Sequence, residues 1–384
     1  MRRFCHPVAV TRTEQLLAEL IALPSVNPAF LPPRHPQAGE KDAAEFLAAT
    51  AARAGLEVEF QKVLPGRANL LARLRPRGRI KQTILLAPHL DTVGAYGTQF
   101  IPQRRHGRLH GRGACDTKGS VAAMLGALCE LAKLKTRPLE TEIIFAGLID
   151  EEHAQAGSRA LVASGFKADL AIVGEPTKLH VVTAHKGCLW LQLETCGRAA
   201  HGATPQLGKN AVHEMARIVC ALETDYAAQL KKKKHRLLGT GTVNVGQISG
   251  GTQPNIVPAS CRIAIDRRTL PGETEAGVRR EIAALLRAKK LSAQISSTKL
   301  ASALPLETNS KLPLVQNFLR AAGQSRPVGV DYFCDAAVLA AGGTPSVVFG
   351  PGDIAQAHTA DEWISLAELE RGKNLLLNFL KSLS

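Results

Sequence analysis

Hydrophobic residues in the first half of the chain follow two patterns. Residues 11–23 and about 40–54 place apolar side chains on one face of a helix. Three short runs are instead apolar on both faces, which is typical of strands buried in the middle of a sheet. An Ala/Leu-rich helix at 120–134 separates the first two runs, and this strand, helix, strand alternation predicts an α/β sandwich. The runs are 84–87, 142–149 and 170–173.

The pattern changes after residue 186. Residues 190–195 alternate between apolar and polar, a helix is expected at 211–222, and two more strands are expected at 242–246 and 261–265. A half-buried sheet with helices predicts an α+β domain.

From about residue 300 the chain returns to the first pattern, with an Ala/Leu helix, a strand at 347–349 and a final helix. We therefore expect one domain built from residues 1–185 and 299–384, and a second domain, residues 186–298, inserted into it.

Chain length and composition fit this division. A chain of 384 residues exceeds what one hydrophobic core usually serves. Residues 1–7 lack the apolar stretch of a signal peptide, and no segment approaches membrane-spanning length, so we expect no membrane association. Eight cysteines without Cys-x-x-Cys pairs indicate reduced thiols, which predicts a cytoplasmic protein.

The formal net charge is +15, and residues 231–236 form a compact basic run. Such a run raises the hypothesis of a nucleic-acid-binding protein. A solvated loop is the favoured interpretation, because aromatic residues for base stacking are scarce. The excess positive charge would also attract anionic substrates to a cleft.

Acidic and histidine-bearing turns follow the expected strands. Ligand sites in α/β sheets form outside the carboxyl ends of strands, so we expect these turns to converge. A further turn, residues 357–359, follows the late strand. Two imidazoles and several carboxylates form a donor set that suits zinc, with cobalt or manganese as substitutes. The other turns are residues 88–91, 113–116, 150–152 and 174–176.

Over nearly its whole length the chain resembles the two-zinc metallopeptidase and amidohydrolase family of acetylornithine deacetylase, succinyl-diaminopimelate desuccinylase, glutamate carboxypeptidase and aminoacylase. That resemblance implies a zinc-peptidase-like catalytic α/β sandwich with an inserted smaller α+β dimerisation (lid) domain. It is carried by the ordered motifs at residues 89–93, 111–119, 150–152, 174–177, 200–205 and 357–359.

The same resemblance implies two zinc ions in each subunit. Asp116 would bridge the two ions, His89 and Glu175 would complete one site, and Glu152 and His358 would complete the other. Two zinc ions bring four positive charges and three ligand carboxylates remove three, so the site favours a deprotonated water.

Two carboxylates beside these ligands are expected to assist them. Asp91, two residues after His89, is suited to hold the second nitrogen of the imidazole, although a turn-capping aspartate is the alternative. The resemblance makes Glu151 the general base, which would take the proton from the attacking water. A solvated acidic turn is the alternative for Glu151.

The resemblance also implies residues that act on the substrate. His201 would stabilise the oxyanion, usually from the partner subunit of a dimer. Asn255 and Arg268 resemble substrate contacts, with Arg268 suited to clamp a carboxylate and Arg267 as its rival. The resemblance also places Asp335 in a loop on the substrate side of the metals. The two residues before it, Phe333-Cys334, depart from the family pattern, so the specificity for the side chain of the substrate stays open.

These observations predict a zinc-dependent hydrolase that cleaves the amide bond of a small N-acyl amino acid and acts as a homodimer. Glu175 favours a deacylase or carboxypeptidase, because aspartate at this position accompanies the peptidases of the family that release amino-terminal residues. A zinc carboxypeptidase or dipeptidase is the alternative. A nucleic-acid-binding protein and a metal-bound scaffold without catalysis are the hypotheses from other classes.

Overall fold

The computed structural model describes residues 10–298 and 302–384. Residues 1–7, which lack the apolar stretch of a signal peptide, lie outside the described residues, as does the start of the third predicted segment at residue 299. The chain divides into two compact units, which are described separately. The first unit comprises residues up to Thr183, Thr308–Val328 and Cys334–Ser384, and the second comprises Ala184–Glu307 and Gly329–Phe333.

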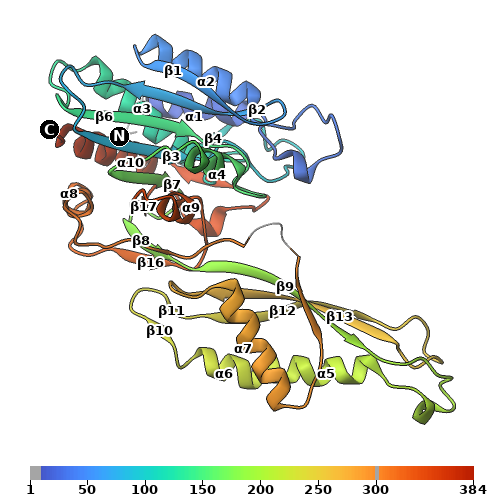
Figure 1. Cartoon of the computed structure of the whole chain (residues 1–384). Coiled ribbons are helices and arrows are strands. Elements are labelled where there is room, and N and C mark those ends of the chain that lie inside the picture. The colour runs from blue at the N-terminus through green and yellow to red at the C-terminus, as the bar shows by residue number, and fades with distance from the viewer. Residues whose placement is uncertain (1–9, 299–301) are drawn as a thin grey trace, which may run out of the picture. The chain divides into compact units, whose positions relative to one another are not determined.

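A large mixed sheet forms the middle of the first unit (Figure 1). Its order in this unit is β1-β2-β6-β3-β7-β17-β8. The central strands β6, β3, β7 and β17 are parallel, whereas β1, β2 and β8 join the sheet antiparallel. The strands are β1 (Glu57–Leu64), β2 (Arg67–Leu74), β3 (Gln82–Pro88), β6 (Thr141–Gly147), β7 (Leu170–Gly174), β17 (Ser346–Val348) and β8 (Val182–His185).

Helices cover both faces of this sheet. Helices α1, α2, α3, α8 and α10 share one buried apolar cluster with the sheet, and α4 and α9 pack on the other side. The predicted helices at 11–23, 40–54 and 120–134 are confirmed as α1, α2 and α3. The helices are α1 (Arg12–Ala22), α2 (Lys41–Arg53), α3 (Lys118–Lys133), α4 (Ala156–Ala163), α8 (Pro313–Ala321), α9 (Ala336–Ala341) and α10 (Leu366–Lys381), with 3-10 turns η1 (Pro28–Phe30) and η4 (Ile354–Gln356).

Local sequence explains where the helices that flank the sheet begin. The Thr11 hydroxyl accepts a hydrogen bond from the backbone N–H of Glu14, and Ser365 does the same for Glu368. Both residues therefore act as N-caps, which satisfy donors that the first helical turn leaves open. Helix α3 is buried along most of its length, which explains its Ala/Leu-rich sequence.

A small antiparallel sheet accompanies the large one in the first unit. Its order is β18-β5-β4, and Trp363 of β18 pairs with His110 of β5. The sequence pattern did not reveal this sheet, because each strand has only three residues. The strands are β4 (Gln103–Arg105), β5 (Arg108–His110) and β18 (Trp363–Ser365).

The second unit is a four-stranded antiparallel sheet in the order β12-β13-β9-β14. Leu191, Leu193 and Ile265 of this sheet pack with Ile218 of α5 and Ile282 of α7 in one apolar cluster. The elements are β9 (Gly187–Cys196), η2 (Pro205–Leu207), α5 (Ala211–Ala221), the π-helical turn η3 (Leu222–Tyr226), α6 (Ala227–Leu230), β10 (Lys234–His235), β11 (Gly239–Thr240), β12 (Thr242–Gly250), β13 (Ser260–Thr269), α7 (Glu275–Ala288), β14 (Gln294–Ser297), β15 (Leu306–Glu307) and β16 (Val328–Val330).

Among the residues that the structure describes, we find no helix with both the length and the apolar character that crossing a membrane requires.

Candidate metal centre

Three of the predicted turns leave the carboxyl ends of neighbouring parallel strands. His89 follows β3, Glu151 and Glu152 follow β6, and Glu175 follows β7. The close approach of β3 and β7 requires glycine at Gly174, because a Cβ there would lie 2.8 Å from the Cβ of Pro88. The adjacent ends of β6, β3 and β7 therefore bring these side chains to one edge of the sheet.

A strand precedes the turn with Asp116, as predicted, but it is not an apolar strand of the central sheet. Asp116 lies in a loop between β5 of the small sheet and the start of α3, so it does not follow a strand of the central sheet. The loop is instead fixed by side-chain contacts to its backbone, which a hydrophobic pattern does not report. The Asp116–Thr117 peptide bond is cis.

Two groups of potential metal ligands share Asp116. His89, Asp116 and Glu175 form one group, and Asp116, Glu152 and His358 form the other, with the ligand atoms of each group within 4.8 Å of one another. The structure thus brings together the five residues predicted as ligands.

The donor atoms of each group lie close enough together to share a metal ion. His89 Nε2 lies 3.2 Å from Asp116 Oδ1 and 3.8 Å from Glu175 Oε1. On the other side of Asp116, His358 Nε2 lies 3.3 Å from Asp116 Oδ2 and 3.2 Å from Glu152 Oε2. Ligands at about 2.0–2.2 Å from a tetrahedral zinc would be about 3.3–3.6 Å apart. The distances around His358 lie close to this range, whereas the 3.8 Å between His89 and Glu175 exceeds it.

The two groups differ in their access to solvent. The side chain of His89 is 1% exposed, whereas that of His358 is 54% exposed. A ligand entering from solvent therefore meets the group that contains His358 first.

The site concentrates buried carboxylates, so positive charge bound among them would be stabilised. Burial, reinforced by neighbouring carboxylates, raises the pKa of Glu151 and of Glu175 well above the usual value. Burial opposes protonation of His89, yet hydrogen bonds with Asp116 and Asp91 raise its pKa well above 6.5. Hydrogen bonds with Asp116 and Glu152 raise the pKa of His358 to about 10. Cations among these groups would replace the protons that the carboxylates otherwise retain.

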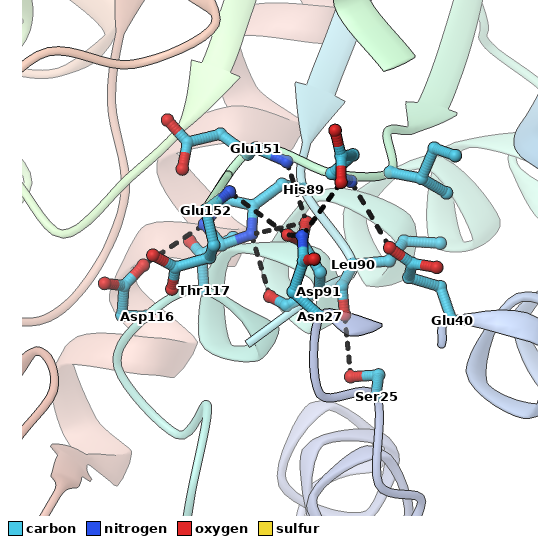
Figure 2. Close-up of polar contacts among 12 residues, drawn as sticks. Ser25, Asn27, Glu40, His89, Leu90, Asp91, Asp116, Thr117, Glu151 and Glu152 are labelled. Carbon is cyan, nitrogen blue, oxygen red and sulfur yellow. Dashed lines mark hydrogen bonds and ion pairs between the residues drawn. The ribbon is translucent and has the colours of Figure 1, made fainter. Parts of the chain in front are cut away.

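Asp91 connects the two turns that leave β3 and β6 (Figure 2). His89 Nδ1 lies 2.9 Å from the backbone oxygen of Asp91 and 3.5 Å from its Oδ1. The Asp91 carboxylate accepts hydrogen bonds from the backbone N–H groups of Glu151 and Glu152, at 3.0 and 3.1 Å. Asp91 therefore contacts the histidine mainly through its backbone and uses its side chain to hold the Glu151–Glu152 turn.

The Glu151 carboxylate points away from Asp91 (Figure 2). Its backbone N–H donates to Asp91, while the nearby positive charge of His89 lowers the pKa of its carboxyl and the negative charge of Glu175 raises it. This leaves one carboxylate beside the two ligand groups that belongs to neither of them.

Sequence reasoning missed the residues that support Asp91. Asn27 Nδ2 donates to the carboxylates of both Asp91 and Asp150, at 2.8 and 3.0 Å. Arg67 in turn pairs with Asp150 and with Glu40. The only sequence signal was Asn27 directly before Pro28, which by itself indicates a turn.

Asp335 lies in the first unit at the start of α9. It is 1% exposed, and Ser158 Oγ donates a 2.5 Å hydrogen bond to its Oδ1. Burial raises the pKa of Asp335 to about 6.

Cys115 is fully buried beside Asp116, and burial raises the pKa of its thiol far above the usual value, so it is not an activated nucleophile.

The remaining predicted site residues belong to the second unit. His201 and Asn255 lie on adjacent segments, since the backbone N–H of Gly202 donates to the Asn255 oxygen. Arg268 pairs with Asp266 through bonds of 2.9 and 3.1 Å. Its rival Arg267 is fully buried and holds Glu273 with two 2.8 Å bonds, which is a structural role.

Comparison with known proteins agrees with this geometry. Residues 85–382 match the model of peptidase family M20/M25/M40. The chain belongs to this peptidase family. As an M20-family member it is a metal-dependent hydrolase of amide or peptide bonds, so the predicted enzyme class is confirmed.

Two curated relatives that are similar to this M20-family chain carry the same name. Acetylornithine deacetylase of Myxococcus xanthus is 31% identical over 86% of this chain and 89% of the relative. Acetylornithine deacetylase of Photorhabdus laumondii is 32% identical over 92% of both chains.

Solved M20-family structures share the fold. Aminopeptidase PepT from Bacillus cereus has a TM-score of 0.77 at 23% identity, covering 96% of this chain and 97% of that one. The YXEP protein of Bacillus subtilis, described as a dinuclear metal-binding peptidase, has a TM-score of 0.71 at 13% identity, with 96% and 97% covered. The predicted fold class, a catalytic α/β sandwich with a smaller α+β domain, is confirmed.

Proposed function

We propose that this chain is a zinc-dependent deacylase that hydrolyses the amide bond of small N-acyl amino acids. The observation that carries the proposal is Asp116, whose two oxygens face His89 on one side and His358 on the other, at 3.2 and 3.3 Å. A carboxylate shared in this way by two donor groups suits two metal ions better than one.

In this proposal each subunit holds two zinc ions, with cobalt or manganese as substitutes. His89, Asp116 and Glu175 would hold one ion, and Asp116, Glu152 and His358 the other. When bound, the ions would lower the pKa of a bound water to about 7 and polarise the scissile carbonyl.

Glu151 is the proposed general base. It would take the proton of the attacking water and return it to the departing amine nitrogen, so no covalent intermediate with the protein forms. Asp91 supports this role, because it fixes the Glu151 backbone through a 3.0 Å hydrogen bond that does not involve the Glu151 carboxylate. The role of Glu151 requires a side chain that is not itself a ligand, and both donor groups are complete without it.

His201, Asn255 and Arg268 are proposed to act on the substrate from the second unit, and Asp335 from the first. His201 would stabilise the developing oxyanion, while the guanidinium of Arg268, which is 32% exposed, would bind the substrate carboxylate. Asn255 lies beside the backbone of His201, so the two residues would meet the same part of a substrate.

The deacylase proposal is supported by relatives named acetylornithine deacetylase. A carboxypeptidase or dipeptidase reaction is the alternative within the same family. The nucleic-acid hypothesis loses support, because Lys233 and His235 of the basic run are paired with Glu281 and Glu307, at 2.6 and 3.0 Å.

We also propose that the enzyme is a cytoplasmic homodimer. β12 lies at one end of the second unit's sheet, and its Ile248 is 60% exposed. An edge strand with an exposed apolar residue favours pairing with a second copy. The seven cysteines in the described part of the chain are free, in keeping with a reducing compartment.

The decisive test is a zinc-reconstituted assay with N-acetyl, N-succinyl and N-formyl amino acids and with dipeptides. We expect turnover of an N-acyl amino acid by the native protein and a loss of about 10²- to 10⁴-fold in kcat for Glu151→Gln. Glu130→Gln, which changes a partly exposed carboxylate paired with Lys373, is the matched control.

Turnover of dipeptides alone would transfer the proposal to the peptidase alternative. Full activity of Glu151→Gln would refute the proposed base, and the absence of turnover on every member of the panel would refute both the deacylase proposal and its peptidase alternative.

A further inference from the structure

The fully buried carboxylate of Glu362 lies four residues after His358 and accepts four hydrogen bonds. Its Oε1 accepts from the backbone N–H groups of Cys115 and Asp116, at 2.8 and 2.9 Å. Its Oε2 accepts from the backbone N–H of Gly113 at 2.9 Å and from Arg112 Nη1 at 2.8 Å. Each carboxylate oxygen therefore has two donors.

The donors come from the loop that carries Asp116. This loop has no strand partner of its own, so the backbone N–H groups of Gly113, Cys115 and Asp116 depend on one side chain for an acceptor. Without the Glu362 carboxylate these buried donors would be left unsatisfied, and the loop would rearrange to reach other acceptors.

Backbone contacts hold the same two segments together. The Gly111 N–H donates to the Glu362 oxygen at 3.0 Å, next to the β5–β18 pairing. Gln99 adds a second connection, because its Nε2 donates to the backbone oxygens of Thr359 and Ala360. Its backbone oxygen accepts a hydrogen bond from the backbone N–H of Arg112. The segments that carry Asp116 and His358 therefore form one supported structure.

Glu362 is not a further metal ligand. Both of its oxygens are occupied by donors, and its charge is balanced by Arg112 at 2.8 Å. It belongs to neither group of potential ligands within the described residues. Its influence on the metal centre must pass through the backbone of Asp116.

We propose that Glu362 is a positioning residue for the metal centre, which sets the place of the shared ligand Asp116 relative to His358. This inference rests on the metal centre in the proposed function. Residues that orient ligands in this way commonly change metal affinity by about 10- to 100-fold when they are replaced.

The test compares Glu362→Gln with Glu273→Gln. The control changes a carboxylate in the second unit that also pairs with a buried arginine, Arg267, and accepts a backbone N–H, that of Leu270. Each metal-free protein is titrated with Co²⁺, and its visible absorption, Co²⁺ dissociation constants and urea unfolding are measured.

We expect Glu362→Gln to weaken Co²⁺ binding by about 10- to 100-fold and to alter the visible spectrum. Glu273→Gln should lose stability and keep native Co²⁺ binding. Native affinity and spectrum in Glu362→Gln, together with a loss of stability like that of the control, would show a purely structural role and overturn the proposal.

A second measurement applies to the native protein if Glu362→Gln does not fold. In the metal-free state, the amides of Gly113, Cys115 and Asp116 should exchange slowly with solvent, and rapid exchange would contradict the proposal. If the native protein itself binds no Co²⁺, the metal centre fails as well, whereas unchanged binding in Glu362→Gln removes only the positioning role.

Discussion

The Asp91 carboxylate accepts a 3.0 Å hydrogen bond from the backbone N–H of Glu151, so the turn after β6 is fixed by a residue of the turn after β3. The two turns leave adjacent parallel strands, and the hydrogen bond fixes their relative height. A carboxylate is required because all its donors are N–H groups.

Asp91→Asn should therefore loosen the Glu151–Glu152 turn. Both Asp91 oxygens accept hydrogen bonds in the native protein. In either orientation, the NH₂ group of the new asparagine would therefore face another donor, a backbone N–H or the Asn27 amide. We expect kcat to fall by about 10- to 100-fold, measured by steady-state kinetics with the best substrate of the panel. Asp169→Asn, which removes a carboxylate bonded to the Thr83 N–H elsewhere in the same unit, should keep native kcat. Equal losses in the two variants would contradict the role of Asp91.

Metal content should follow the two donor groups. We expect two zinc ions per native chain and one in His358→Ala, because His358 contributes to one group only. Elemental analysis after dialysis against metal-free buffer measures the ratio. His110→Ala, which removes a histidine paired with Asp361, is the control and should keep two ions. One ion in the native protein would contradict the shared role of Asp116.

Removal of Arg268 should weaken binding of substrates that carry a free carboxylate. A charge-assisted hydrogen bond contributes about 1.5–3 kcal/mol, so KM of Arg268→Ala should rise by about 10- to 100-fold. The amidated form of the same substrate should lose little. Arg262→Ala, on the same strand and paired with Glu194, serves as the control. An equal change for both forms of the substrate would reject the clamp.

His185 should make stability depend on pH. Burial lowers its pKa to about 4, and its Nδ1 lies 2.9 Å from the Lys186 oxygen. Between pH 6.5 and about 4 the unfolded state binds a proton that the folded state excludes, so stability is lost as the pH falls through this window. The loss amounts to about 3 kcal/mol at most.

Urea unfolding with a chelator present, from pH 7.5 to 4.5, measures this loss. His185→Asn keeps a donor for the Lys186 oxygen and does not titrate, so its stability should fall less steeply than that of the native protein. The exposed His213, replaced in the same way, is the control for removing a histidine from the chain. Identical slopes in His185→Asn and native protein would refute the assignment.

The edge of β12 should control self-association. Ile248→Asp places a charge on this edge strand, and we expect it to shift the protein from dimer to monomer in sedimentation velocity. Ile80→Asp, at an apolar residue of the first unit that is 41% exposed, should remain dimeric. A monomeric native protein at micromolar concentration would contradict the homodimer.

The sequence predicted the central elements well, because their apolar patterns are long. Strands β3, β6 and β7 and helix α3 were found for this reason, as were the turns with His89 and Glu175. The strand before Asp116 was wrongly expected to be an apolar strand of the central sheet, since β5 has only three residues and belongs to a separate small sheet.

The supporting residues could not be predicted. Asn27 and Asp150 are 123 positions apart, and Glu362 and Asp116 are 246 positions apart, yet each pair is joined by one hydrogen bond. No period along the chain reports such contacts, because they depend on the packing of whole elements. The predicted metal ligands could be identified from sequence motifs. The residues that hold them in place could be identified only from the folded structure.

The position of β17 has a consequence for how the protein is made. Strand β17 pairs with β7, but it is translated only after the whole 184–307 segment, as are His358 and Glu362. A growing chain that has just completed β7 exposes one edge of that strand while the second unit emerges from the ribosome. Metal capture with the full ligand set therefore requires translation past residue 362, and a chain interrupted before residue 358 would present His89 and the carboxylates without His358 and the buried support of Glu362.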